Sequence, residues 1–248
     1  MELIKTSELS VGFKQESVLV DLNFSIHKDR ITIVLGKSGC GKSTLLKTLV
    51  GLIPPIGGDI YFSREKVDFF SEKSLQSLYR RIGVLYQNSA LLNSFNLYDN
   101  IALPIRMNHP GFQIEIEREL VLTALSKVGL QECWAKFPAE LSGGMRKRAS
   151  LARAMILDPD IVFCDEPSAG LDPITSYELD KMMLSLKHNF RMTIVVVTHE
   201  LRSIEKIADD VIVLKDGGIH FCGTFQEMLA AEDPFINTFF LKQGHKDD

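Results

Sequence analysis

Residues 36–44 read GKSGCGKST and follow the pattern G-x-x-x-x-G-K-[ST] in full. Glycines at such spacing let backbone N–H groups close around a phosphate, and a helix that starts there adds its dipole. The Lys42 ammonium can reach the outer phosphates of a nucleotide, and the Ser43 hydroxyl can bind Mg²⁺. The preceding residues 31–36 (ITIVLG) form a β-branched apolar run that is typical of a buried strand. The sequence therefore predicts a phosphate site, whereas a chance glycine-rich turn is the structural alternative.

Other polar residues also stand directly after apolar runs. Asp165 and Glu166 end the run DIVFCDE, His199 ends TIVVVTH, and Gln87 follows a shorter run. Ligands of open α/β sheets bind at the carboxyl ends of the strands, where these side chains are expected. Asp165 suits the ligand shell of Mg²⁺, and Glu166 could orient or deprotonate a water molecule. The alternatives are a helix cap for the acidic pair and structural roles for His199 and Gln87.

A second glycine-rich stretch lies about a hundred residues later. Residues 140–150 read ELSGGMRKRAS, in which Ser142 could cap a helix that starts at Gly143. Such a start is either an ordinary turn or another anion site. We interpret the following basic run, residues 146–148, as a solvated helix face.

The apolar pattern predicts the elements that position these residues. It indicates an amphipathic strand over 17–26, and buried strands over 31–36, 160–166 and 191–200. Helices are expected from about residue 41 and over 175–190, and a hairpin turns at Asp216-Gly217-Gly218. This alternation predicts an α/β fold with a parallel sheet. Residues from about 90 to 158 have helical spacing without a buried strand, which predicts an inserted helical subdomain.

The composition of the 248 residues is that of a globular protein, with 45% hydrophobic and 24% charged residues. The net charge of −4 argues against nucleic acid as a partner. Cys40, Cys133, Cys164 and Cys222 are scattered without metal-ligand spacing, and Cys164 is expected in the core. The sequence shows neither an apolar signal core at its start nor the ~18 apolar residues of a membrane span. We expect a soluble chain that works at a membrane only through a partner.

In this order and spacing, the motifs resemble those of the ATP-binding-cassette (ABC) ATPases over almost the whole chain. The resemblance identifies Gln87 as the Q-loop glutamine, residues 141–144 as the signature, residues 168–172 as the D-loop and His199 as the switch histidine. It implies one ABC ATPase domain: a P-loop core with a parallel sheet and an N-terminal antiparallel β subdomain, and an inserted α-helical subdomain. The expected limits are 1–88 and 159–222 for the core, 89–158 for the helical subdomain and 223–248 for the tail.

The resemblance also implies a mechanism that uses ATP and Mg²⁺. Two copies of the chain pack head to tail, and each ATP lies between the phosphate loop of one copy and the signature of the other. Glu166 is then the general base, and His199 senses the γ-phosphate. The implied nucleotide, metal and partner-nucleotide residues are Phe13, Gly36, Lys37, Ser38, Gly39, Cys40, Gly41, Lys42, Ser43, Thr44, Gln87, Asp165, Ser142, Gly143, Gly144, Met145 and Asp172, of which Asp172 acts across the dimer.

Two of these positions carry alternatives. Phe13 stands where the family stacks an aromatic ring on adenine, and the alternative is a core phenylalanine facing inward from a strand. Met145 replaces the glutamine that most often follows the two signature glycines. Because Ser142 and both glycines remain, we expect ATP binding to survive this exchange.

Met145, "LDPITS" and the tail sequence "DPFINTFF" are similar to the ATPases of the MCE-associated lipid transporters. This resemblance implies a separate membrane permease, an MCE-domain lipid-binding protein and a small regulatory subunit as partners, at the cytoplasmic face of a bacterial inner membrane. A regulatory ATPase of the cell-division type and an importer ATPase for another small substrate stay open. Residues 91–104 are expected to dock on the permease, although about half of them would be core residues. The tail packs on its own core or on the partner ATPase.

Overall fold

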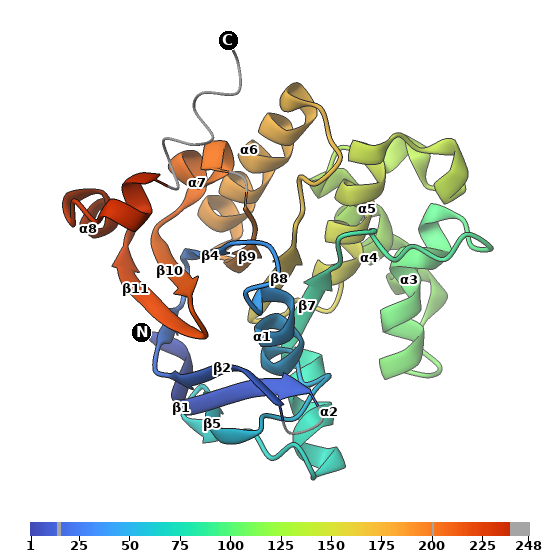
Figure 1. Ribbon diagram of the computed structural model, residues 1–248. Helices are drawn as coiled ribbons and strands as arrows, with labels where there is room; N and C mark the ends of the chain where they lie inside the picture. Colours follow the sequence, from blue (N-terminus) through green and yellow to red (C-terminus); the bar gives the residue numbers. More distant parts are fainter. Residues whose placement is uncertain (14–15, 200, 239–248) are drawn as a thin grey trace.

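The computed structural model describes residues 1–13, 16–199 and 201–238, which form two sheets surrounded by helices (Figure 1). Within these residues the larger sheet has six strands in the order β11-β10-β4-β9-β8-β7. Its neighbouring strands are parallel, except that β11 pairs antiparallel with β10. The strands are β4 (Ile31–Gly36), β7 (Ile82–Leu85), β8 (Ile161–Asp165), β9 (Thr193–Val197), β10 (Asp210–Lys215) and β11 (Gly218–Thr224). The predicted α/β fold with a parallel sheet and a C-terminal hairpin is confirmed.

A smaller antiparallel sheet is built from N-terminal residues in the order β2-β1-β5-β6, and β3 also pairs with β1. Its strands are β1 (Glu2–Phe13), β2 (Glu16–Leu22), β3 (Ser25–His27), β5 (Gly57–Phe62) and β6 (Glu65–Lys66). The single strand predicted over 17–26 is wrong, because β2 ends at Leu22 and β3 starts at Ser25. The Thr6 hydroxyl fills the break: it donates to the Leu22 carbonyl and accepts from the Phe24 N–H, both at 3.0 Å.

The two faces of the parallel sheet bury different sets of side chains, as the alternation along a strand requires. On β8, Phe163 points toward helix α1 (Lys42–Leu49), which lies between the two sheets in Figure 1. Cys164, the next residue, points to the opposite face, where the other helices pack. Both side chains are fully buried, and burial raises the pKa of the Cys164 thiol to about 12. Cys164 is the core residue that the sequence predicted.

The remaining helices cover the parallel sheet and extend to one side of it. They are α2 (Glu72–Arg81), α3 (Leu97–Asn108), α4 (Ile114–Lys127), η1 (Gln131–Cys133), η2 (Pro138–Glu140), α5 (Gly143–Met155), α6 (Pro173–Phe190), α7 (Leu201–Ile207) and α8 (Phe225–Ala230). Helices α3, α4 and α5 gather at the right of Figure 1, and residues 90–158 contain no strand. In the described parts of the chain, no helix is both long and apolar enough to cross a membrane.

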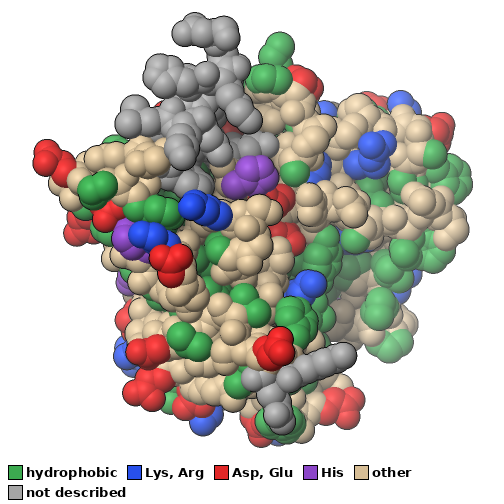
Figure 2. All heavy atoms as spheres, viewed as in Figure 1, with side chains coloured by type: hydrophobic (Ala, Val, Ile, Leu, Met, Phe, Trp, Pro, Cys, Tyr) green, Lys and Arg blue, Asp and Glu red, His purple; other side chains and the backbone are tan. Residues whose placement is uncertain are grey.

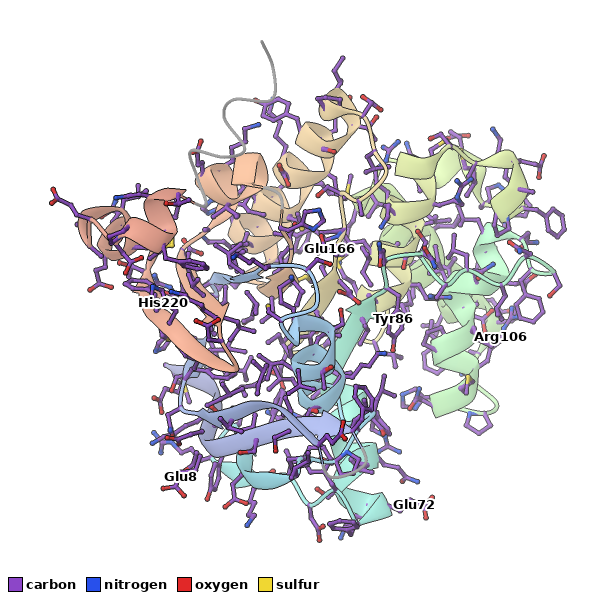
Figure 3. All side chains as sticks on the ribbon, viewed as in Figure 1. Glu8, Glu72, Tyr86, Arg106, Glu166 and His220 are labelled. Atoms are coloured by element: carbon purple, nitrogen blue, oxygen red, sulfur yellow. The ribbon has the colours of Figure 1, made fainter. Side chains whose placement is uncertain are left out.

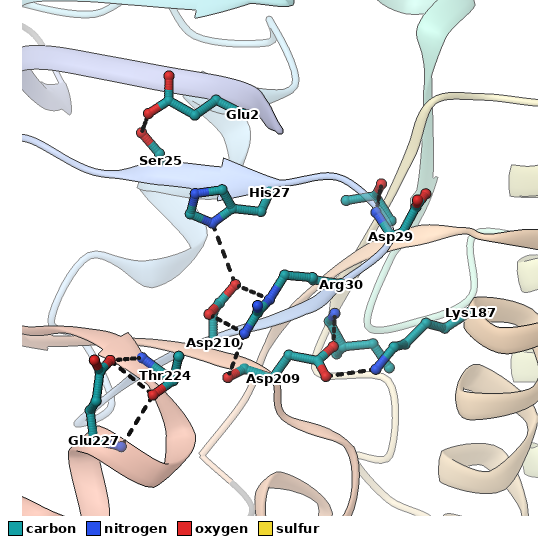
Figure 4. A network of polar contacts seen from close by, with 12 residues as sticks. Glu2, Ser25, His27, Asp29, Arg30, Lys187, Asp209, Asp210, Thr224 and Glu227 are labelled. Atoms are coloured by element: carbon teal, nitrogen blue, oxygen red, sulfur yellow. Dashed lines mark hydrogen bonds and ion pairs between the residues drawn. The ribbon is translucent and has the colours of Figure 1, made fainter.

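A polar network fastens the amino-terminal ends of β4 and β10 to their neighbours (Figure 4). The Arg30 guanidinium pairs with Asp210 at 2.7 Å, and His27 of β3 approaches the same carboxylate at 3.6 Å. The Asp209 carboxylate accepts from the Ile31 N–H at 2.7 Å and pairs with Lys187 of α6 at 2.6 Å. These contacts join strands from both sheets and α6 at the edge opposite the strand ends that carry the predicted site residues.

Helix α5 is joined to the parallel sheet through Lys147, which is only 5% exposed. Its ammonium donates to the Gln87 carbonyl at 2.5 Å and to the Glu166 carbonyl at 3.2 Å. The interpretation of residues 146–148 as a solvated helix face is therefore wrong for Lys147. The buried ammonium is accommodated because carbonyl oxygens replace the water that it would otherwise hold.

Replacing Lys147 by methionine keeps much of the side-chain volume but leaves both carbonyls without this donor. We expect Lys147→Met to lower the free energy of unfolding by about 1–3 kcal/mol, measured by urea denaturation. Lys136→Met is the matched control, because Lys136 is exposed. Equal denaturation midpoints for the two variants would contradict this role of Lys147.

Candidate active site

The predicted phosphate loop lies between β4 and α1, at the carboxyl end of the parallel sheet. No side chain caps the amino-terminal end of α1, so its first N–H groups are not satisfied by a cap. Lys42 is 7% exposed and reaches back over the loop, where its ammonium donates to the carbonyls of Gly36 at 2.8 Å and Lys37 at 3.0 Å. Uncapped amides and a buried ammonium make this loop suited to an anion.

Gly41 at the start of α1 is required for two reasons. Its φ angle of 102° lies in the left-handed region, which disfavours residues with a Cβ. A Cβ there would also lie 2.9 Å from side-chain atoms of Val18 and Leu19. Strand β2 therefore presses directly on the turn that shapes the phosphate loop.

A cavity of about 650 Å³ opens over this loop. It is lined by Val18, Gly36, Lys37, Ser38, Gly39, Gly41, Lys42, Ser43, Thr44, Gln87, Glu166 and His199. Most of the residues that the sequence proposed for binding and chemistry thus share one concave surface, although they come from four separate stretches of the chain. A single cavity with several converging polar groups is the usual form of a ligand site.

Asp165 ends β8 and Glu166 follows it directly; Glu166 lines the cavity, whereas Asp165 is not among the lining residues. Glu166 has a φ of 45°, and its N–H donates to the Val197 carbonyl at 2.8 Å. Figure 3 shows Glu166 near the centre of the molecule, above α1. Its carboxylate lies 2.8 Å from Nδ1 of His199, so base and sensor candidates touch each other directly. Burial, and then the charge of Glu166, raises the pKa of Asp165.

The acidic pair also has oxygens that would accommodate a cation. Oδ1 of Asp165 and Oε2 of Glu166 are buried and have no hydrogen-bond partner within the protein. Unpartnered buried carboxylate oxygens are costly without a partner, and oxygen is the ligand that Mg²⁺ prefers. The residues present therefore fit Mg²⁺, with Ser43 and Gln87 in the adjoining cavity. The described residues hold no cluster of three or more His, Cys, Asp or Glu side chains suited to a metal ion.

The signature residues lie at the start of α5 and do not line this cavity. Ser142 caps the helix, since its Oγ accepts from the Met145 N–H at 3.2 Å, as the sequence predicted. The Met145 side chain is partly buried against the core beneath α5. Asp172 is likewise outside the cavity and caps α6, accepting from the N–H groups of Ile174 and Thr175 at 3.1 and 3.0 Å.

Phe13 and Cys40 are the proposed nucleotide residues that do not line the cavity. The Phe13 side chain is 50% exposed at the end of β1, so the alternative of a core phenylalanine is wrong. Lys14 and Gln15, which follow Phe13, lie outside the described residues. The role of Phe13 toward adenine stays a prediction.

Sequence reasoning missed two residues of this region, Val18 and Lys147. Val18 lines the cavity from β2, and an apolar residue in a strand carries no sequence signal for such a contact. Lys147 does not line the cavity, and its ammonium donates hydrogen bonds to the backbone carbonyls of Gln87 and Glu166. A signal for Lys147 existed, because it stands four residues before Leu151 and so lies on the apolar face of the predicted helix.

The predicted tail packs partly on its own core. Ile236 is 5% exposed, and Phe235 is packed against the same core cluster. The Phe235 ring makes cation–π contacts with two lysines. The Lys215 ammonium lies 4.4 Å from the ring centroid, and the Lys37 ammonium lies 5.7 Å from it. Residues 239–248 lie outside the described residues, and whether the tail also contacts a partner ATPase stays a prediction.

Known proteins resemble this chain over most of its length. The protein described as "Probable ribonucleotide transport ATP-binding protein mkl" from Mycobacterium tuberculosis is 36% identical over 236 residues, which cover 95% of this chain and 66% of that relative. The chain thus spans slightly less than two thirds of the mycobacterial protein. The "Intermembrane phospholipid transport system ATP-binding protein MlaF" of Escherichia coli is 35% identical over 96% of this chain and 88% of its own length.

Solved structures share the fold. The cbiO1 subunit of the ABC transporter complex cbiONQ from Clostridium perfringens superposes with a TM-score of 0.85 and 28% identity, over 97% of this chain and 95% of its own. The ATP-binding cassette MJ0796, in a dimeric structure bound to ADP and Pi, superposes with a TM-score of 0.79 and 27% identity. The match covers 90% of this chain and 98% of that one. A family model described as "ABC transporter" matches residues 19–169. The resemblance seen in the sequence motifs is confirmed, and the chain belongs to the ABC transporter family.

Proposed function

We propose that this chain binds and hydrolyses ATP to drive lipid movement through a separate membrane permease. The observation that carries the ATPase proposal is the single cavity that collects Lys42, Ser43, Gln87, Glu166 and His199. The lipid proposal is supported by the similarity to MlaF, whose printed description names intermembrane phospholipid transport. We also propose the domain limits expected from the sequence, with 89–158 as the helical subdomain.

The phosphate loop would hold the triphosphate. The residues at the uncapped start of α1 line the cavity, and Lys42 would exchange its carbonyl partners for phosphate oxygens. Ser43, Gln87 and Asp165 would hold Mg²⁺. The metal, when bound, neutralises charge on the phosphates during hydrolysis.

Glu166 would act as the general base for water attack on the γ-phosphate. Its backbone is fixed by a positive φ angle and by the bond from its N–H to the Val197 carbonyl, and its side chain lines the cavity. His199 contacts the same carboxylate and would orient it while also facing the γ-phosphate. A proton taken from water by Glu166 would thus arrive next to an imidazole that can share it.

The signature would act on a second copy of the chain. Ser142 and the amides of Gly143 and Gly144 form a helix start outside this chain's own cavity, so they are placed for an anion from elsewhere. The MJ0796 cassette, with 27% identity to this chain, is described as dimeric. We propose the same head-to-tail pairing here, with Asp172 and Met145 at the interface.

Residues 91–104 are the proposed permease surface. Leu97 and Ile101 are fully buried, whereas the Leu92 side chain is 42% exposed. The buried Asn100 amide holds the loop, because it accepts from the Leu92 N–H at 2.8 Å and donates to the carbonyls of Leu92 and Phe95 at 3.1 Å. This loop also follows Gln87 directly, so it could transmit the nucleotide state to a partner. Figure 2 shows apolar side chains gathered on the same side of the molecule, over α3 and α4.

An MCE-domain protein and a small regulatory subunit would complete the complex at the cytoplasmic face of a bacterial inner membrane. This part of the proposal rests on the MlaF-like sequence features alone. A regulatory ATPase of the cell-division type, or an importer ATPase for another small substrate, would share the same active site. The substrate therefore has to be tested on the assembled complex.

Removing the base should abolish hydrolysis without abolishing binding. We expect Glu166→Gln to lower the ATPase rate by about 10²- to 10⁴-fold. The dissociation constant for a fluorescent ATP analogue should stay within a factor of about three of the parental value. The exposed Glu178 provides the matched control Glu178→Gln, which should hydrolyse ATP at the parental rate. Undiminished hydrolysis by Glu166→Gln would refute the assignment of the base.

A charge on the permease surface should block assembly. We expect Leu92→Glu to weaken co-purification with the membrane permease by about tenfold or more, because a carboxylate would be buried at the interface. Nucleotide affinity should not change. Leu229→Glu is the control, since Leu229 is 54% exposed on α8, which lies on the opposite side of the molecule from α3 (Figure 1). Wild-type binding by Leu92→Glu would exclude this surface.

The transported substrate can be read from reconstituted vesicles. We expect the complex with its permease to move a fluorescent phospholipid in an ATP-dependent way, and the Glu166→Gln complex to move none. Hydrolysis without phospholipid movement would instead favour the regulatory ATPase or another substrate.

A further inference from the structure

The start of the signature helix α5 packs directly against the start of α6 in the same subunit. A Cβ built on Gly144 would lie 2.3 Å from Cγ2 of Thr175, with the next atom, Cβ of Thr175, at 3.7 Å. Gly144 is buried and is not among the residues with a positive φ angle. The need for glycine at this position is therefore spatial, and it comes from one methyl group.

That methyl group cannot turn away freely. Thr175 Oγ1 donates to Oδ2 of Asp172 at 2.5 Å, and the Thr175 N–H donates to Oδ1 of the same carboxylate at 3.0 Å. Because Oγ1 and Cγ2 share one Cβ, a rotation that moved the methyl from Gly144 would break the hydroxyl bond to Asp172. The Thr175 hydroxyl is also the largest cause of the lowered pKa of Asp172.

The neighbouring signature glycine has a softer contact. A Cβ on Gly143 would lie 3.3 Å from Cδ2 of Leu171, the far end of a flexible side chain in the D-loop. Leu171 and Thr175 thus form a wall beside the first turn of α5, and only its Thr175 part is held rigidly. Asp172 fixes that part from the other side.

We propose that Thr175 is a positioning residue that couples the D-loop to the signature within one subunit. Its hydroxyl holds Asp172, and its methyl sets where Gly144 and the adjoining amides lie. This inference rests on the proposed function, in which those amides close on the ATP of a second copy. Motion of Asp172 would then shift the signature, because both are tied to one side chain.

The test is a set of substitutions in a Glu166→Gln background that traps ATP-bound dimers. We expect Gly144→Ala to weaken ATP-dependent dimerisation by about tenfold or more, since the new methyl overpacks this contact. Adding Thr175→Ser removes Cγ2 but keeps the hydroxyl. The dimer dissociation constant should then return to within about threefold of the parental value. Sedimentation with and without ATP measures the dimer.

Two controls separate this coupling from a general effect. Thr175→Val keeps a methyl at this place and should not rescue Gly144→Ala. Thr175→Ser should also not alter the dimerisation of Gly143→Ala, whose methyl faces Leu171. Binding of a fluorescent ATP analogue to monomers should be equal in all variants, because the signature does not line this chain's own cavity.

The proposal is overturned if Gly144→Ala dimerises like the parent, or if Thr175→Ser and Thr175→Val rescue it equally or not at all. Urea denaturation of the nucleotide-free chains is the second measurement: Gly144→Ala should lower the midpoint, and Thr175→Ser should restore it. If the Glu166→Gln parent forms no dimer with ATP, the proposed function fails, while denaturation still decides whether Thr175 sets the place of Gly144.

Discussion

The parallel direction of β4, β7, β8 and β9 is the constraint on which the candidate active site depends. Parallel strands of one sheet end at the same edge, so the loops that follow them converge there. The phosphate loop follows β4, Gln87 follows β7, the acidic pair ends β8 and His199 follows β9. The antiparallel β11 contributes no described residue to this cavity. The cavity contains these residues because their strands run in the same direction, which brings residues far apart in the chain to one edge of the sheet.

Helix α5 connects this edge to the rest of the molecule. Its first turn carries the signature glycines, and its second turn carries Lys147, which binds the carbonyls next to the proposed metal-binding and catalytic side chains. One rigid element thus holds both the chain's own site and the surface proposed for its partner's nucleotide. The contact between Gly144 and Thr175 adds α6 and the D-loop to the same assembly. Small displacements at the cavity and at the signature are mechanically linked through these packed elements.

Much of the site was predictable because its residue types have few alternative uses at this spacing. The phosphate loop, the buried strands and the capping role of Ser142 follow from local pattern and are found in the structure. The errors arose where a distant element decided the outcome. Residues 17–26 split into two strands because Thr6 binds the backbone between them. The basic run at 146–148 buries Lys147 because two carbonyls that follow β7 and β8 accept hydrogen bonds from it.

The sequence by itself predicted the α/β class and a phosphate site, since glycine spacing, strand-ending carboxylates and apolar periodicity are local properties of the chain. The family followed from the resemblance of the ordered motifs to those of ABC ATPases. The tertiary structure decided which of these residues share a cavity, how Glu166 and His199 touch, and why Gly144 lacks room for a side chain. These facts depend on contacts between segments that are remote in sequence, and no local pattern records how closely two such segments approach.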